Sequence, residues 1–182
     1  YNPAGLASLQ KIDFSSHFTR PFGAFSFGTL GITHQGWGGY LLLLDSDVLE
    51  ERDFYGNPIG SFRYTSLGLV AGLGYMLNGS LSLGLQVKAY ALALPTRGFG
   101  LSLSPCFLYR NGKLTYGVVW RNLFSTPIRY ADGHTEPWIT DVALGVAWVH
   151  GTDIYVVDFT ENLITRGDIS CVRMGVESKR FY

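Results

Sequence analysis

The sequence predicts an all-β protein, an antiparallel up-and-down transmembrane β-barrel. Three observations lead to this prediction. Apolar and small side chains alternate along most of the chain, which is the period of a strand and not of a helix. Short turns alternate with longer loops, as in a barrel with one short-turn rim. Glycine is abundant, at 23 of 182 residues, and aromatic residues make up 15%.

The charge composition excludes one class of partner and favours another. Lys+Arg and Asp+Glu are balanced at 14 each, so the formal net charge is zero. A protein without a basic surplus does not attract phosphate backbones, and we expect no nucleic-acid partner. Only 15% of the residues are charged, whereas a soluble domain typically carries about 25%. This shortage fits a barrel whose outer wall faces lipid.

The alternation sets the predicted strands. It is clearest over residues 81–91, where leucine, valine or alanine occupies every second position and mostly small or polar residues lie between. The same pattern recurs before and after this segment, and no segment keeps a helical period. We therefore predict ten strands and no helix. The strands are expected at 10–19, 21–27, 29–44, 61–77, 81–94, 98–110, 114–123, 138–149, 152–160 and 168–179.

The connections between these strands fall into two classes. Asn78-Gly79, Asn111-Gly112 and His150-Gly151 are predicted tight turns, and Asn-Gly supplies the positive φ angles that a two-residue hairpin needs. The connections at 45–60, 124–137 and 161–167 are longer. Because short and long links alternate, all tight turns should meet at one rim and all long loops at the other.

The apolar residues occupy every second strand position, and we infer their outward orientation from the residues at the positions between them. A soluble barrel or sandwich with its apolar face inward would show the same alternation. A water-facing phase would carry many Lys, Glu and Thr side chains, but here it is mostly Gly, Ser and Ala. Small residues let the inner side of a closed barrel pack and curve. We therefore expect leucines and valines toward lipid.

Aromatic residues mark both predicted rims. Tyr and Trp prefer the membrane–water boundary because the ring is apolar and the tip forms hydrogen bonds. The girdle expected near the tight turns consists of Tyr75, Tyr109, Tyr116, Trp148 and Tyr155. Its counterparts at the other rim are expected to be Phe99, Trp120, Trp138 and Phe159.

Three residues bear on the topology. Pro105 falls in the middle of a predicted strand and cannot donate to the ladder, so it predicts a bulge or a break in the wall. Cys106 and Cys171 should lie near opposite rims, too far apart for a disulfide, and we expect both to be unpaired.

A family resemblance begins at the opening segment Asn2-Pro3-Ala4-Gly5-Leu6-Ala7. It resembles the NPAG signature of FadL-like outer-membrane proteins, and most of all that of the PorV/PorQ type. Shorter similarities follow in the family's order, at residues 83–88, 108–110, 114–122, Asp158 and 175–177. Ser104-Pro105-Cys106 departs from the pattern, since the family usually has an Asp there.

The resemblance implies a barrel of about fourteen strands. Residues 1–182 would then be a single barrel domain truncated at both ends, and a complete ten-stranded barrel is the alternative.

Catalytic chemistry is poorly represented. The histidines at 17, 34, 134 and 150 are dispersed, and no motif for a metal, phosphate or nucleophile is present. We predict no enzyme and no catalytic, cofactor or metal site. The informative polar residues are those of the inward phase, either a structural network inside the barrel or the lining of a permeation path. They are Asp13, His17, Lys88, Arg121, Asp141, Asp158, Arg173 and Glu177.

Two functions compete for a protein expected in the bacterial outer membrane. The resemblance to PorV/PorQ-type proteins implies an accessory to protein secretion or cell-surface export, with secretion machinery or exported proteins as partners. A covered interior with large ordered loops, such as the acidic loop 45–58 or loop 124–137, would support it. The alternative is a FadL-like channel for small hydrophobic molecules, supported by an apolar cavity near Val70 and Val119. A soluble lipocalin-like binder or an enzyme is a more distant option.

Overall fold

The computed structural model describes residues 2–23, 25–93, 96–162 and 171–178. The protein is all-β, with 72% of residues in strands and 5% in helices. Thirteen strands form one antiparallel sheet, and two more form a separate hairpin. This confirms the predicted strand class and the antiparallel pairing.

Ten strands cross the main sheet in the order β1-β2-β3-β6-β7-β8-β9-β13-β14-β15, so each pairs with the next main strand along the chain. They are β1 (Asp13–Thr19), β2 (Phe25–His34), β3 (Trp37–Ser46), β6 (Thr65–Met76), β7 (Leu81–Ala93), β8 (Arg97–Asn111), β9 (Leu114–Arg121), β13 (Asp141–His150), β14 (Asp153–Asn162) and β15 (Cys171–Ser178). The short elements are the 3-10 helices η1 (Pro3–Ser8) and η2 (Pro21–Gly23) and the strands β4 (Leu49–Arg52), β5 (Pro58–Phe62), β10 (Phe124–Ser125), β11 (Ile128–Tyr130) and β12 (Thr135–Glu136).

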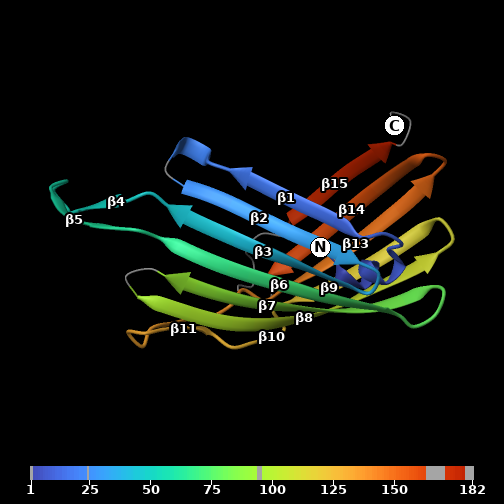
Figure 1. Ribbon diagram of the computed structural model, residues 1–182. Helices are drawn as coiled ribbons and strands as arrows, with labels where there is room; N and C mark the ends of the chain where they lie inside the picture. The colour runs from blue at the N-terminus through green and yellow to red at the C-terminus, as the bar shows by residue number, and fades with distance from the viewer. Residues whose placement is uncertain (1, 24, 94–95, 163–170, 179–182) are drawn as a thin grey trace.

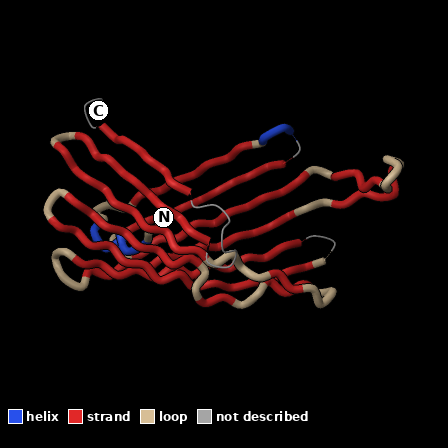
Figure 2. The backbone as a smooth tube through the Cα atoms, turned by 180° about the vertical axis from the view of Figure 1, so that it is seen from behind, coloured by secondary structure: helices blue, strands red, loops and turns tan. Residues whose placement is uncertain are grey.

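The sheet is a curved, open trough. Figure 1 shows β1 to β3 in blue in front, with β13 to β15 in orange and red behind, and Figure 2 gives the view from the other side. The strand order begins at β1 and ends at β15. These edge strands do not pair with each other in the described part of the chain, so the barrel that we predicted is not closed here.

The predicted split between the second and third strands is wrong. We expected strands at 21–27 and 29–44, but β2 ends at His34 and β3 begins at Trp37. The chain reverses at residues 35–36, where Gly36 has a φ of +82°. Glycine adopts this left-handed conformation at little cost, which is why the reversal occurs there and not near Gly28. The expectation of no helix is also wrong, because η1 and η2 are present.

Four short connections meet at one end of the sheet, the turn end, on the right in Figure 1. They lie at residues 35–36, 77–80, 112–113 and 151–152, and Gly112 and Gly151 have positive φ as predicted. Asn78-Gly79 differs, because neither residue has positive φ. Instead the Asn78 Oδ1 atom accepts hydrogen bonds from the backbone N–H groups of Ser80 (2.9 Å) and Leu81 (2.8 Å) in a four-residue loop.

The longer connections lie at the opposite end, the loop end. The connection at residues 47–64 contains the β4–β5 hairpin, and the 122–140 segment folds back on the sheet through β10 and β11, both paired with β8. The link from Ala93 to Arg97 is short, so turn and loop lengths do not alternate as strictly as predicted. Most of the predicted loop 161–167 lies outside the described residues.

The two faces of the sheet differ in chemistry. The outer face carries Leu69, Leu73, Leu103 and Val146 among many apolar side chains, and these four are 37% to 59% exposed. The inner face carries small polar residues, including the fully buried Ser102 and Ser104. The leucines therefore do not form a sealed core, in agreement with the predicted orientation. The buried core is instead a small cluster on the inner face that includes Ala4.

Pro105 lies where β8 changes partner. The β8–β9 ladder ends at the pair Cys106–Val119, and beyond Pro105 the partner of β8 is β10, from the pair Leu103–Phe124. A residue without an N–H group therefore marks a break on this side of the strand, as predicted. Cys106 and Cys171 are both free thiols, which agrees with the expectation that they do not pair.

Candidate functional site

The inner face of the trough gathers every polar residue that the sequence singled out. Cross-strand register puts all eight candidates on the same face as the small residues: Asp13, His17, Lys88, Arg121, Asp141, Asp158, Arg173 and Glu177. Only some of them lie close together. Asp13 and His17 belong to the edge strand β1, and Glu177 lies near the end of the other edge strand, β15.

One group of charges surrounds a hollow of about 440 Å³ between β9 and β15. The Arg121 Nη1 atom lies 2.8 Å from the Asp141 Oδ1 atom, in a half-buried ion pair. Asp158 and Arg173 are directly opposite each other on β14 and β15. Opposite charges in register across an antiparallel pair stabilise the sheet. This geometry fits a structural network of charges. A permeation path lined by these charges would have the same geometry.

Asn122 is the polar centre that our sequence reading missed. Its Oδ1 atom accepts hydrogen bonds from the Lys88 Nζ atom (3.1 Å) and the Ser102 Oγ atom (2.7 Å). Its Nδ2 atom donates to the Ile139 carbonyl (2.7 Å), and its backbone N–H donates to the Ser104 Oγ atom (3.0 Å). The residue is 8% exposed and has a φ of 55°. Asparagine is among the few residues that tolerate this left-handed conformation.

The opening Asn-Pro-Ala-Gly motif covers the inner face at the turn end. Asn2 caps η1, since its Oδ1 atom accepts a hydrogen bond from the Ala4 N–H (3.0 Å). Its Nδ2 atom donates to the carbonyl of Phe107 on β8 (2.7 Å). Ala4 is completely buried. The motif therefore fastens the N-terminal segment to the sheet instead of leading directly into the first strand.

Glycines of the sheet make room for this segment. A Cβ atom on Gly74 would lie 2.5 Å from the Pro3 carbonyl oxygen, and one on Gly84 would lie 2.4 Å from the Ala4 nitrogen. Gly36 also holds the N-terminal segment, because its backbone N–H donates a hydrogen bond to the Leu6 carbonyl (2.9 Å). The small residues of the inner phase thus serve close backbone approach.

An apolar hollow of about 330 Å³ lies farther toward the loop end. Phe27, Leu42, Leu44 and Val70 line it on the sheet, together with Tyr90 and Trp138 among others. Trp138 was expected on the outer rim, and this assignment is wrong. Its indole Nε1 donates to the Thr126 carbonyl (2.8 Å), which holds the ring over the inner face.

The apolar cavity that we expected near Val70 and Val119 is therefore present only in part. Val70 lines the apolar hollow, whereas Val119 is 8% exposed and belongs to the buried cluster with Ala4.

Aromatic side chains gather on the outer face at the turn end, where we expected the girdle. Trp148 and Tyr155 are a cross-strand pair with ring centroids 5.5 Å apart, and Tyr109 and Tyr116 stack at 6.4 Å. Tyr75 lies near the end of β6, one residue before its last, and is 69% exposed. At the loop end Phe99 and Trp120 are exposed on the outer face, and Phe159 shares that face but is less exposed.

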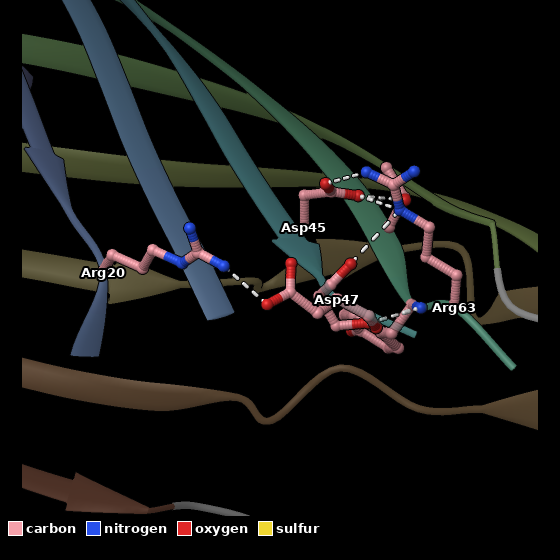
Figure 3. Close-up of polar contacts among 7 residues, drawn as sticks. Arg20, Asp45, Asp47 and Arg63 are labelled. Carbon is pink, nitrogen blue, oxygen red and sulfur yellow. Dashed lines mark hydrogen bonds and ion pairs between the residues drawn. The ribbon is translucent and has the colours of Figure 1, made fainter. Parts of the chain in front are cut away.

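Ion pairs anchor the base of the β4–β5 hairpin (Figure 3). Arg20, at the end of β1, pairs with Asp47 at 2.5 Å, and Arg63 pairs with Asp45. Asp45 also accepts a hydrogen bond from the Thr65 hydroxyl at 2.6 Å. Each exposed pair contributes little alone, but together they join the ends of β1, β3 and β6.

No group of three or more His, Cys, Asp or Glu side chains among the described residues could hold a metal ion. None of the described helices is both long and apolar enough to cross a membrane. Comparison of the sequence with protein-family models gives no match, and comparison with curated proteins gives none either.

The close contact between the N-terminal segment and the sheet can be tested with Gly84→Ala. The new methyl group would lie 2.4 Å from the Ala4 nitrogen and 2.7 Å from the Cys106 sulfur, so η1 must move. Hydrogen exchange of residues 2–10, followed by mass spectrometry, should become faster. Gly79→Ala is the control, because a Cβ there meets nothing within 4 Å. Equal exchange rates in both variants would show that η1 does not need a glycine at position 84 in order to pack on the sheet.

Asn122→Ala tests the polar centre. The substitution removes three side-chain hydrogen bonds and leaves alanine in a left-handed conformation, so the free energy of unfolding should fall by about 2–4 kcal/mol. Asn122→Gly relieves the backbone and should lose about 1–3 kcal/mol. Urea unfolding in detergent micelles measures both. The exposed Asn111→Ala should change stability by less than about 0.5 kcal/mol, and a similar value for Asn122→Ala would contradict the assignment.

Proposed function

We propose that this chain forms part of the wall of an outer-membrane β-barrel of the PorV/PorQ type and acts as an accessory to protein secretion or cell-surface export. The membrane placement is supported by the outer face, where apolar side chains stay exposed on strand after strand. Monomeric soluble proteins rarely expose so continuous an apolar surface. A lipid environment would remove it from water.

The observation that carries the export role is the β4–β5 hairpin. It projects beyond the loop end of the sheet (Figure 1), and at its tip Phe54 is 98% exposed and Tyr55 is 85% exposed. Adjacent aromatic rings that are bare at the tip of an ordered hairpin are typical of a surface that contacts a partner. A bacterial barrel directs its longer loops outward, so the tip would face the cell exterior.

The hairpin tip is held in one conformation. The Asp53 Oδ1 atom accepts hydrogen bonds from the backbone N–H groups of Tyr55 (2.9 Å) and Asn57 (2.8 Å), and Oδ2 accepts one from the Asn57 side chain (3.0 Å). The Asn57 amide, followed by the backbone donors, lowers the pKa of Asp53 below its usual value. The carboxylate therefore stays ionised at neutral pH and keeps the turn formed. A preformed tip loses less entropy when it binds a partner.

The inner face supports the same role. The N-terminal segment covers it at the turn end, and its Ala4 is buried against Cys106 of β8. In a closed barrel this segment would occupy the interior near the turn-end mouth. A covered interior is more useful to a protein that works through its loops than to an open channel.

A second candidate is uptake of small hydrophobic molecules. The apolar hollow lined by Phe27, Leu42 and Val70 favours it, because such a lining stabilises an alkyl chain. The two functions differ in their effect on cells that lack the protein. Loss of uptake of a fluorescent fatty acid, with unchanged surface proteins, would support this candidate over export.

The membrane placement predicts a large effect of arginine on the outer face. Leu85→Arg or Leu103→Arg should lower stability by about 2–4 kcal/mol in lipid vesicles, as measured by denaturant unfolding. Ile59→Arg, on the exposed β5 strand of the hairpin, is the control and should have little effect. If Leu85→Arg and Leu103→Arg fold in lipid as well as wild type, the outer face is not in contact with acyl chains.

The export role predicts a specific defect when the hairpin tip is changed. A deletion strain that carries the Phe54→Ser and Tyr55→Ser double variant should retain proteins in the periplasm that wild-type cells display or secrete. Quantitative mass spectrometry of the surface, medium and periplasm measures this, with the amount of variant in the outer membrane as a check on folding. Val48→Ser, exposed just before β4, should export normally. An unchanged surface proteome in the deletion strain itself would refute the role.

A further inference from the structure

A hollow of about 400 Å³ lies at the loop end, and four of the seven residues that line it are aromatic. Its lining residues are Tyr64, Tyr90, Leu92, Ile128, Tyr130, Glu136 and Trp138. Glu136 is the only one with a carboxylate, and no lysine or arginine is among the described residues that line the hollow. It lies beside the apolar hollow described above, because Tyr90 and Trp138 line both.

The rings are fixed by their own contacts. The Tyr64 and Tyr90 hydroxyl groups lie 3.0 Å apart and share a hydrogen bond. The rings of Tyr90 and Trp138 meet edge to face, with centroids 6.4 Å apart and planes at 76°. The Tyr130 hydroxyl donates to the Glu136 Oε2 atom at 2.8 Å. The walls therefore come from two separate parts of the chain, residues 64–92 and the 122–140 segment.

Glycines of β8 let the 122–140 segment approach closely. A Cβ atom on Gly98 would lie 2.8 Å from the Tyr130 ring, and one on Gly100 would lie 2.8 Å from Ile128 and 3.2 Å from the Trp138 nitrogen. The backbone pairs Arg129–Phe99 and Tyr130–Gly98 hold the segment in register with β8. The hollow is thus built into the fold.

The charge of the hollow is negative. Burial, followed by the hydrogen bond to Glu136, raises the pKa of Tyr130 to about 12. Burial also raises the pKa of Tyr64. Both phenols are therefore neutral at pH 7, and Glu136 supplies the formal charge at a half-exposed position, where the His134 Nε2 atom lies 3.9 Å from its Oε1 atom.

We propose that this hollow binds a quaternary ammonium group, with its methyl groups against the aromatic rings and Glu136 at the mouth as the counter-charge. Ring faces attract cations, and a quaternary ammonium ion is the cation that aromatic cages recognise best because it is weakly hydrated. A primary amine would lose hydrogen bonds to water that the rings cannot replace. The site does not depend on the choice between export and uptake, and the adjoining apolar hollow leaves room for an attached alkyl chain.

Isothermal titration of the full chain in maltoside detergent, at constant ionic strength, tests the proposal. Tetramethylammonium and choline should bind, whereas 3,3-dimethylbutan-1-ol, the neutral analogue of choline, should bind more weakly by about fivefold or more. Absence of tetramethylammonium binding, or equal binding of the neutral analogue, would overturn the proposal.

Matched variants locate the site. Glu136→Gln and Trp138→Leu should each weaken choline binding by about fivefold or more. Glu51→Gln on the hairpin and Trp120→Leu on the outer face should not. Glu136→Gln replaces oxygen by nitrogen at one atom and keeps the fold testable if Trp138→Leu is unstable. Equal affinities in the site variants and their controls would place the binding elsewhere and refute the proposal.

The same titration separates two sources of the ligand. A short-chain phosphatidylcholine below its critical micelle concentration should bind more tightly than choline if the natural ligand is a lipid headgroup, and no more tightly if it is a free cation. The corresponding phosphatidylglycerol should not compete in either case. Equal competition by phosphatidylglycerol would indicate that the acyl chains, and not the ammonium group, are recognised, which contradicts the proposal.

Discussion

The strict alternation of side chains across the sheet is the constraint on which the rest of the structure depends. Successive residues of a strand point to opposite faces, so a shift of one position would exchange the two faces completely. In this protein the exchange would bury Leu69 and Leu73 against the N-terminal segment and expose Ser102 and Ser104. Register is therefore specified most strongly where apolar outer residues alternate with small inner ones, as along β8.

Small inner residues have a second consequence, because they let other parts of the chain lie directly on the backbone of the sheet. At the turn end Gly74 and Gly84 admit η1, and at the loop end Gly98 and Gly100 admit the 122–140 segment. Both ends of the inner face are thus covered by a segment that lies outside the ten main strands. The three hollows described above remain open between and beside them. One is lined by several charged residues, one is mostly apolar with Lys88 in its lining, and one is mostly aromatic with Glu136 in its lining.

Sequence alone predicted the features that repeat, together with the break at Pro105, and missed several features that depend on long-range contacts. The alternation predicted both faces of the sheet because the pattern repeats over many residues. It also predicted that Lys88 and Asp158 lie on the inner face. The reversal at Gly36 was missed because Gln35-Gly36 is not an Asn-Gly pair, the strongest short sequence signal of a hairpin turn. Trp138 was assigned to a rim because it stands beside a predicted strand, but its position is decided by the long-range hydrogen bond to Thr126.

Asn122 illustrates why the polar centre was harder to find than its partners. The sequence marked Lys88 and Arg121 by their charge, whereas an uncharged amide at the end of a strand resembles a turn residue. Its importance depends on a left-handed backbone that turns the amide toward β7, β8 and Ile139 at once. One neutral side chain satisfies a lysine, a serine and a backbone carbonyl without adding charge to the interior. A carboxylate could accept from Lys88 and Ser102 but could not donate to Ile139, so the amide is the group that this position requires.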